Sequence, residues 1–323
     1  MSFSWKKIKK PIFILGPMAG ISTQPLMKMC KHFGADVVFT PMVSSNAIMY
    51  NEKETLKIAQ FSKHERPVIA QVFGYDSDIM IKAINIIDKK LNPDGIDINL
   101  GCPAPKIIKS MSGSAFLKDY QKAIDFVTKI RQGYSGQLSV KTRLGYNKED
   151  VLPFLLELEK IGIDCVTIHG RTVVQKYTGH SNKEAIHNIA NQLNIPVILN
   201  GDIDSWQSAK QEISKSKIKG VMLSRFAMQR PWVFKEIKQN KDISFTNKQL
   251  ANIITKHFNY HLKYDKSRTY TDMRKFLAGY LKHFSNAKDL RKLAISIQNK
   301  KDFNKLISKI KTSKYDRKIF KNT

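Results

Sequence analysis

The residues best suited to chemistry in this sequence follow short apolar runs, and one of them is a cysteine. Cys102 lies in the segment Asn-Leu-Gly-Cys-Pro at residues 99–103, between a glycine and a proline that together favour an irregular backbone. A free thiol is mostly protonated at neutral pH, so it can donate a proton at least as readily as it attacks a substrate. The residues around Cys102 include no histidine that would indicate a Cys–His nucleophile pair.

Polar or glycine-rich segments also follow most of the other apolar runs. Lys141 and His169 each end one run and are candidates to contact a cofactor, although such a lysine also suits a barrel mouth and such a histidine a packed core. Gly201 allows close backbone approach and Arg225 supplies a fixed charge, a combination that favours a bound phosphate. Asp202 suits a hydroxyl contact or a helix cap equally well. The segments that follow these apolar runs include Gly-Pro-Met-Ala-Gly (16–20), Gln71, Asn-Gly-Asp (200–202) and Ser-Arg (224–225).

The apolar runs themselves predict the elements that position these residues. Their length and β-branched content favour eight buried strands, at residues 12–15, 37–40, 68–73, 96–100, 138–142, 165–169, 196–200 and 220–224. Amphipathic helices are expected between them, for example over 76–90 and 119–131. The predicted apolar faces are Ile79, Ala83, Ile86 and Ile87 in the first helix, and Ala123, Phe126, Val127 and Ile130 in the second.

Alternation of strands and helices predicts an α/β fold with parallel strands joined by right-handed crossovers. Eight units over about 230 residues favour a closed (β/α)8 TIM barrel, with an open doubly wound sheet as the alternative. In such a barrel the carboxyl ends of all strands meet at one face, which would gather the polar segments around one cavity. The sequence contains no Gly-x-Gly-x-x-Gly after a strand and no P-loop motif.

The character of the chain changes near residue 241. The segments 246–264, 270–284 and 292–311 are helical in pattern, basic and aromatic, with no strand signal between them. We therefore expect the barrel over residues 1–240 and a small all-helical C-terminal domain over 241–323, with the last ten residues, 314–323, frayed.

Composition indicates the compartment and the kind of partner. The 55 Lys and Arg against 27 Asp and Glu give a net charge of +28, which favours a polyanion such as nucleic acid or an anionic membrane over a merely solvated surface. Three dispersed cysteines argue against a disulfide framework or zinc cluster, and Cys30 and Cys165 are expected to be buried. No run approaches the ~20 apolar residues of a membrane span, so we expect a soluble cytoplasmic protein.

These segments together resemble the tRNA-dihydrouridine synthases, flavin enzymes that reduce selected uridines in tRNA, and especially the bacterial B type. The resemblance covers nearly the whole chain and rests on residues 17–22, 71–74, 97–107, 113–117, 140–145, 168–179, 200–203 and 230–232. It implies FMN as the cofactor, NADPH as the reductant and tRNA as the substrate. We expect a monomer that binds neither a membrane nor a metal.

The resemblance also implies roles for individual residues. Cys102 would donate a proton to C5 of uracil while reduced flavin delivers hydride to C6. The residues implied to contact FMN are Pro17, Met18, Ala19, Gln71, Lys141, His169, Asn200, Gly201, Asp202, Ser224 and Arg225. The residues implied to contact the uridine are Asn99, Arg171 and Tyr177. The uridine must leave its RNA helix to reach such a site, and the basic C-terminal helices would either hold RNA phosphates or only cover the barrel flank.

Some residues depart from the family pattern. Val173 stands where a second Arg is common, and Gly-His-Ser-Asn at 179–182 stands where an Ala-Asp-Trp-like end is frequent. Ser224–Phe226 replaces Gly-Arg-Gly, at a cost of about 1 kcal/mol if that backbone requires positive φ. Two other functions stay open at this point. One is an FMN barrel oxidoreductase of the dihydroorotate or enoate type acting on a small molecule, and the other is a non-enzymatic RNA-binding protein.

Overall fold

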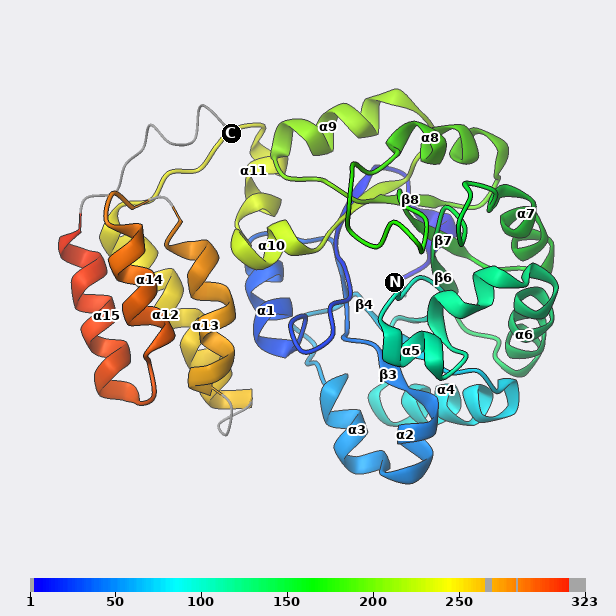
Figure 1. The fold of residues 1–323 in the computed structure, drawn as a ribbon, viewed down its shortest axis with the longest axis horizontal. Coiled ribbons are helices and arrows are strands. Elements are labelled where there is room, and N and C mark those ends of the chain that lie inside the picture. Colours follow the sequence, from blue (N-terminus) through cyan, green and yellow to red (C-terminus); the bar gives the residue numbers. More distant parts are fainter. Residues whose placement is uncertain (1–2, 265–268, 283, 314–323) are drawn as a thin grey trace.

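A computed structural model describes residues 3–264, 269–282 and 284–313, and its centre is a closed parallel barrel (Figure 1). The barrel closes because β2 pairs with both β1 and β4, which confirms the predicted TIM barrel. The barrel strands are β1 (Ile12–Leu15), β2 (Val37–Phe39), β4 (Val68–Phe73), β5 (Gly95–Asn99), β6 (Leu138–Arg143), β7 (Cys165–His169), β8 (Val197–Asn200) and β9 (Gly220–Leu223). The short strand β3 (Val43–Ser44), which the sequence did not predict, extends the sheet beside β4.

Helices surround the barrel between successive strands (Figure 1). The longer ones are α1 (Gln24–His32), α4 (Ser77–Leu91), α6 (Tyr120–Gly133), α7 (Leu152–Ile161), α8 (Lys183–Gln192), α9 (Trp206–Lys215) and α11 (Val233–Gln239). The shorter ones are η1 (Trp5–Lys7), α2 (Ser45–Tyr50), α3 (Glu52–Ile58), α5 (Pro105–Lys109), η2 (Gly113–Lys118) and α10 (Arg225–Gln229).

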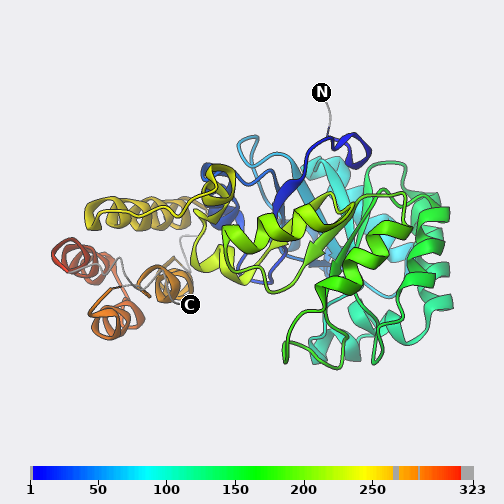
Figure 2. The same cartoon turned by 90° about the horizontal axis from the view of Figure 1, so that it is seen from above.

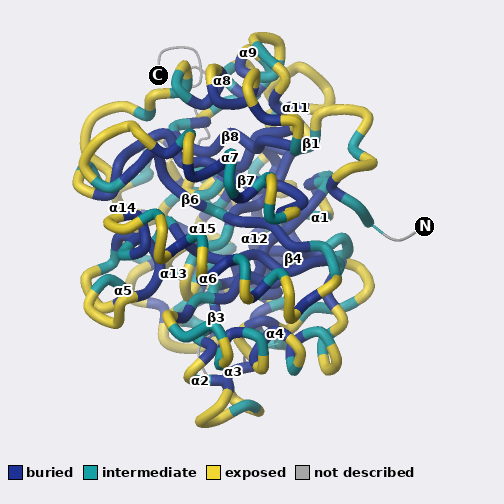
Figure 3. The backbone as a smooth tube through the Cα atoms, turned by 90° about the vertical axis from the view of Figure 1, so that its right-hand side faces the viewer, coloured by how far each residue is buried: buried dark blue, intermediate teal, exposed yellow. Residues whose placement is uncertain are grey.

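The larger core cluster joins the barrel to its ring of helices, and a second cluster includes Trp5, Ile14 and Phe39. Figure 3 shows the strands mainly in the colour of buried residues, and every residue of β7 and β8 is buried. The buried face of α6 is the predicted one, whereas the predicted face of α4 is wrong in part. Met80 and Ile84 are fully buried on α4, while Ile79 and Ile86 are only half-buried. Apolar residues on both sides of this helix make the two faces hard to tell apart by spacing alone. Within the described ranges, no helix is both long and apolar enough to cross a membrane.

In the described part of the C-terminal region, four further helices pack beside the barrel (Figure 2). They are α12 (Asn247–Tyr264), α13 (Thr269–Tyr280), α14 (Ala287–Ile295) and α15 (Lys300–Thr312). Helix α12 packs on α1, and α13 packs on α10. The second contact is close, because a Cβ added at Gly279 would lie 2.6 Å from Gln229 Cα. The predicted fraying of 314–323 lies outside the described residues.

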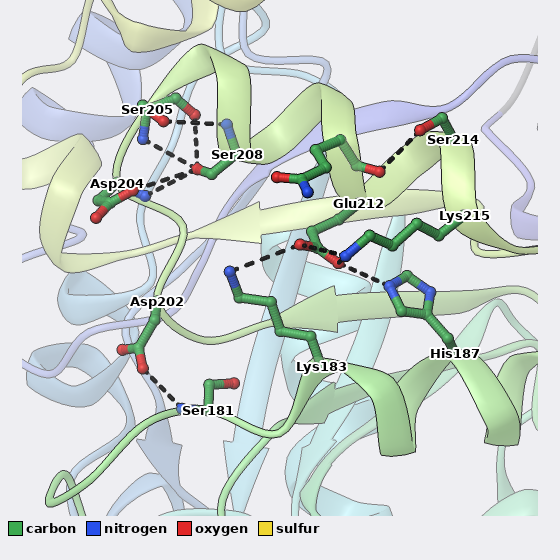
Figure 4. Close-up of polar contacts among 11 residues, drawn as sticks. Ser181, Lys183, His187, Asp202, Asp204, Ser205, Ser208, Glu212, Ser214 and Lys215 are labelled. Atoms are coloured by element: carbon green, nitrogen blue, oxygen red, sulfur yellow. Dashed lines mark hydrogen bonds and ion pairs between the residues drawn. The ribbon is translucent and has the colours of Figure 1, made fainter.

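A buried carboxylate joins the helices α8 and α9, which follow the barrel strands β7 and β8 (Figure 4). Glu212 on α9 lies 2.7 Å from His187 Nε2 on α8, and the other ring nitrogen of His187 lies 2.7 Å from Ser216 Oγ. Lys183 and Lys215 approach the same carboxylate to 3.7 and 3.4 Å. This network holds α8 against α9 on the outside of the barrel.

Candidate active site

A cavity of about 840 Å³ opens where the carboxyl ends of the barrel strands meet. Its volume is within the range of roughly 300–1,000 Å³ that is usual for small-molecule and cofactor sites. Every residue that the sequence predicts for the site lines this cavity. They are Pro17, Met18, Ala19, Gln71, Asn99, Cys102, Lys141, His169, Arg171, Tyr177, Asn200, Gly201, Asp202, Ser224 and Arg225. Among the described residues, no three His, Cys, Asp or Glu side chains gather as a metal site would require.

Cys102 lies in the loop that leaves β5, and hydrogen bonds on both sides hold its backbone. Its N–H donates to Asn99 Oδ1 at 2.9 Å, and its carbonyl accepts from Ser114 Oγ at 2.8 Å. Cys102 is partly exposed at the cavity wall, whereas Cys30 and Cys165 are fully buried as predicted. Cys102 is therefore the cysteine of this chain that a ligand in the cavity can reach.

Two amides and a carboxyl group form a buried chain of hydrogen bonds that reaches the backbone of the cysteine loop. Asn99 Nδ2 donates to Gln71 Oε1 at 2.9 Å, and Gln71 Nε2 donates to Asp97 Oδ2 at 2.7 Å. Burial raises the pKa of Asp97 to about 7, against the opposing effects of hydrogen bonds from Gln71 and Ser139 and the charge of Lys141. The sequence analysis did not select Asp97. A polar residue inside an otherwise apolar strand was the available signal.

Lys141 and Asn200 form a second polar pair on the cavity wall. Lys141 Nζ donates to Asn200 Oδ1 at 2.9 Å, and Asn200 Nδ2 donates to the carbonyl of Met222 at 2.8 Å. Burial lowers the pKa of Lys141 to about 8, and the nearby Arg143 acts in the same direction while Asp97 opposes it. The ammonium is still largely charged at neutral pH, so Lys141 presents a cation to the cavity.

His169 lies at the end of β7 and faces several cations. Burial lowers its pKa to about 2, and the charges of Lys141, Arg143, Arg171 and Arg225 add to the effect. The ring is therefore neutral at physiological pH and can act as a hydrogen-bond donor or acceptor, but not as a cation.

Arg171 makes its hydrogen bonds to other groups of the protein. It is buried, and it donates to the carbonyls of Thr178 and Gly179 at 3.1 and 2.7 Å and to Asp202 Oδ2 at 2.6 Å. Its remaining nitrogen lies 3.4 Å from His169 Nε2. These contacts organise the loop after β7, and the predicted contact of Arg171 with a uridine stays a prediction.

Asp202 joins this loop to the loop after β8 (Figure 4). It accepts from the N–H of Ser181 at 2.8 Å and from Arg171, while Arg225 lies 3.4 Å away. Partial burial disfavours its charge, but the hydrogen bonds from Arg171 and Ser181 outweigh this and lower the pKa of Asp202. Asp202 has a φ of 45°, a left-handed conformation that aspartate tolerates better than most residues.

The strain considered for residues 224–226 does not arise in the structure. Ser224 has a φ of −125°, and neither Arg225 nor Phe226 has positive φ. Glycine is not needed at this turn, so the serine and phenylalanine found here carry no backbone penalty of that kind.

Arg143 lines the cavity and lies in the segment 140–145, but the sequence analysis did not select it. Its guanidinium donates to the carbonyl of Gly101 at 2.8 Å and to the carbonyls of Thr172 and Lys176 at 2.9 and 2.8 Å. It thereby ties the loop of the cysteine to the loop after β7. Its guanidinium carbon also lies 5.5 Å from the ring centre of Tyr177, which is 58% exposed at the cavity mouth.

The chain is similar in sequence to a known family of proteins. Residues 14–315 match the family model described as dihydrouridine synthase (Dus). A probable tRNA-dihydrouridine synthase of Aquifex aeolicus is 29% identical over 307 residues, which are 94% of this chain and 97% of the relative. The tRNA-dihydrouridine synthase B of Pasteurella multocida is 33% identical over 286 residues, 85% of each protein.

Comparisons by structure support the fold. A histamine dehydrogenase from Rhizobium sp. 4-9 aligns with a TM-score of 0.56 at 12% identity, over 76% of this chain and 48% of that chain. A variant of NCR from Zymomonas mobilis aligns with a TM-score of 0.51 at 11% identity, over 76% and 94%. The match to the family model over nearly the whole chain confirms both the predicted family and the predicted class of enzyme. The chain therefore belongs to the dihydrouridine synthase family.

Proposed function

We propose that this protein is a tRNA-dihydrouridine synthase that uses FMN and NADPH to reduce the C5=C6 bond of specific uridines, with Cys102 as the proton donor. The observation that carries the proposal is the position of Cys102, whose partly exposed side chain lines a cavity shared with Gln71, Lys141 and Asn200. The working form that we propose is a cytoplasmic monomer.

The residues present fit FMN. An apolar wall that includes Met18, Met42 and Met222 suits an aromatic ring system, and Gln71 presents an amide beside it. Lys141 supplies a cation that favours an anionic ring, and the exposed Arg225 supplies one for a phosphate. The proposed binding set is completed by the other predicted contacts, which also line the cavity. They are Pro17, Ala19, His169, Asn200, Gly201, Asp202 and Ser224. When bound and reduced by NADPH, FMN supplies a hydride.

The contribution of the protein to the reaction is a proton and a place for the base. Saturating a C5=C6 bond requires a hydride on one carbon and a proton on the other, and Cys102 Sγ holds the proton. The cavity lies among the strand-end loops, so a uridine stacked in an RNA helix does not reach the thiol unless it is extruded. We propose that Tyr177, which lines the cavity and is largely exposed, contacts an extruded base together with Asn99 and Arg171.

The RNA surface that we propose includes the C-terminal region, residues 241–323. Among the described residues, α14 and α15 expose eight Lys and Arg side chains against one exposed and one half-buried aspartate, an imbalance that favours phosphate. Those cations are Lys288, Arg291, Lys292, Lys300, Lys301, Lys305, Lys309 and Lys311. If phosphates provide the affinity, binding falls by nearly one log unit per log unit of salt for each phosphate neutralised, and a flat salt response contradicts this surface.

The deciding experiment compares the variant Cys102→Ala with Cys30→Ala, which alters a buried cysteine outside the cavity. Both purified variants are expected to be yellow and to oxidise NADPH. Only Cys102→Ala is expected to lose dihydrouridine formation on tRNA, by roughly 10²- to 10⁴-fold, the usual contribution of a positioned general acid.

Other outcomes separate the alternative functions. A yellow protein whose reduced flavin is not reoxidised by tRNA indicates an oxidoreductase for small molecules. A colourless protein that still binds RNA indicates a non-enzymatic role. Unchanged dihydrouridine formation by Cys102→Ala removes the thiol from the mechanism.

A further inference from the structure

A continuous chain of hydrogen bonds runs from a buried carboxyl group to the backbone of the cysteine loop. Gln71 Nε2 donates to Asp97 Oδ2 at 2.7 Å, and Asn99 Nδ2 donates to Gln71 Oε1 at 2.9 Å. Asn99 Oδ1 then accepts from the N–H groups of Gly101 and Cys102, at 3.1 and 2.9 Å. Asp97 and Gln71 are almost completely buried, and Asn99 is 7% exposed. Buried polar groups of this kind rely on one another for satisfaction.

The direction of every bond in this chain follows from its first member. The carboxylate oxygen of Asp97 only accepts, so it selects the NH₂ end of the Gln71 amide and turns the oxygen toward Asn99. That oxygen in turn selects the NH₂ end of Asn99. The oxygen of Asn99 is then left facing two backbone N–H groups, which are donors and need an acceptor.

Reversal of either amide would break the chain at the cysteine loop. With Asn99 turned around, its NH₂ group would face the N–H groups of Gly101 and Cys102, and no hydrogen bond would form at that end. Buried donors without partners destabilise the arrangement that leaves them unpaired. The loop has little freedom to adapt, because a Cβ at Gly101 would already lie 3.2 Å from the β6 backbone at Thr142.

We propose that Asp97 is a positioning residue, which fixes the orientation of the Gln71 and Asn99 amides and thereby holds the Cys102 loop in place. This inference rests on the proposed function for its catalytic meaning, since it concerns the residue that would deliver the proton. Asp97 does not line the cavity, and its hydrogen bonds reach the cysteine loop through the two amides, while its charge also acts on Lys141.

The second oxygen of Asp97 makes the arrangement robust to protonation. Ser139 Oγ lies 2.7 Å from Asp97 Oδ1 and donates to it when the carboxyl group is charged. A proton on Oδ1 can be donated to that hydroxyl instead, and Oδ2 still accepts from Gln71. An asparagine at position 97 preserves the same pattern if its NH₂ group faces Ser139.

The two contacts of the Asp97 carboxyl group, with Gln71 and with Ser139, determine which variants test the proposal. Asp97→Asn keeps an acceptor for Gln71 and is the conservative variant, whereas Asp97→Leu removes the acceptor at similar volume. Gln71→Met breaks the chain at its middle link and serves if Asp97→Leu does not fold. Glu212→Gln alters an equally buried carboxylate on the outside of the barrel and controls for a general loss of stability.

The measurement is the alkylation rate of Cys102 by iodoacetamide in each folded protein. The other two cysteines are fully buried, so the native rate reports this thiol. Asp97→Leu and Gln71→Met are expected to raise the rate by roughly tenfold or more, about the effect of one lost hydrogen bond. The rates of Asp97→Asn and Glu212→Gln are expected to stay within about twofold of the native rate, a bound well below that one-bond effect.

Steady-state kinetics supply the second readout, with a lower kcat and an unchanged KM for tRNA expected in Asp97→Leu and a native kcat in Asp97→Asn. Native alkylation rates in both chain-breaking variants overturn the proposal, as does an equal rise in Glu212→Gln. If the unaltered protein forms no dihydrouridine, the proposed function fails, and the alkylation rates still decide whether Asp97 holds the loop.

Discussion

The buried carboxyl group of Asp97 leads to a prediction about stability that is independent of activity. The substitution Asp97→Asn keeps the shape of the side chain and removes its charge. In the native protein burial raises the pKa of Asp97 to about 7 from an ordinary 3.8, so the charged form opposes folding. Any pH dependence that this group causes should therefore disappear in the variant.

The sign and size of the effect follow from the linkage between protonation and folding. A carboxyl group whose pKa is raised on folding gives stability that is fully present below its unfolded pKa and is lost as pH rises through the folded value. The full difference corresponds to roughly 4 kcal/mol, of which roughly 2 kcal/mol falls between about pH 5 and about pH 7. Lys141, with a pKa of about 8, stays mostly charged over this window and adds little to the slope.

The assay is urea denaturation of the native protein and Asp97→Asn at several pH values, followed by circular dichroism. The native protein is expected to lose about 2 kcal/mol more than the variant between the two ends of the window. All other titratable groups are the same in the two proteins and cancel in the comparison. Parallel curves for the two proteins refute the reasoning, because they mean that Asp97 has an ordinary pKa in the folded state.

Three further substitutions test other contacts. Arg230→Met leaves the buried carboxylate of Glu236 without its cation. Urea denaturation at neutral pH should show a loss of about 3 kcal/mol in the free energy of unfolding. The double variant Arg230→Met/Glu236→Leu should recover most of that loss. No recovery in the double variant contradicts that account. Lys141→Met should raise the urea midpoint, because the variant no longer buries a cation. Flavin titration of the same variant should show FMN binding at least tenfold weaker, roughly the contribution of one charge-assisted hydrogen bond. Unchanged FMN affinity excludes the proposed contact. Gly279→Leu should push α13 away from Gln229 and weaken tRNA binding in filter assays without changing flavin content. Native affinity shows that the packing of these helices does not matter for RNA.

The barrel was predictable because its strands repeat one strong signal. Each long strand is a β-branched run buried on both faces, such as 68–73, and its end carries a polar or glycine-rich segment. Strand β3 escaped prediction because two residues, Val43 and Ser44, carry no periodicity. The face of α4 was misassigned in part because apolar residues occupy both of its sides, and only packing decides between Met80 and Ile79.

The cavity residues were predictable for a topological reason, whereas their partners were not. Parallel strands in a barrel end at one face, so residues as distant as Gln71 and Ser224 were expected to meet. Asp97 and Arg143 went unselected because their importance depends on neighbours from other strands and loops. A carboxylate within a strand has no visible role until Gln71 is known to lie beside it. The register between strands determines which residues lie side by side, and the spacing of residues along one strand does not reveal it.

The docking of the C-terminal helices on α1 and α10 has a geometric consequence for substrate choice. These two helices follow β1 and β9, the first and last barrel strands, which pair with each other, so the helical region is fastened beside that pair. Lys28 of α1 also bonds to Tyr264 of α12 at 3.0 Å, and Lys275 of α13 bonds to the carbonyl of Gly20 at 3.3 Å. An RNA gripped by α14 and α15 would thus meet the thiol at one fixed span. The enzyme would then select a nucleotide by its distance from the bound part of the folded RNA. The identity of the neighbouring bases would matter less.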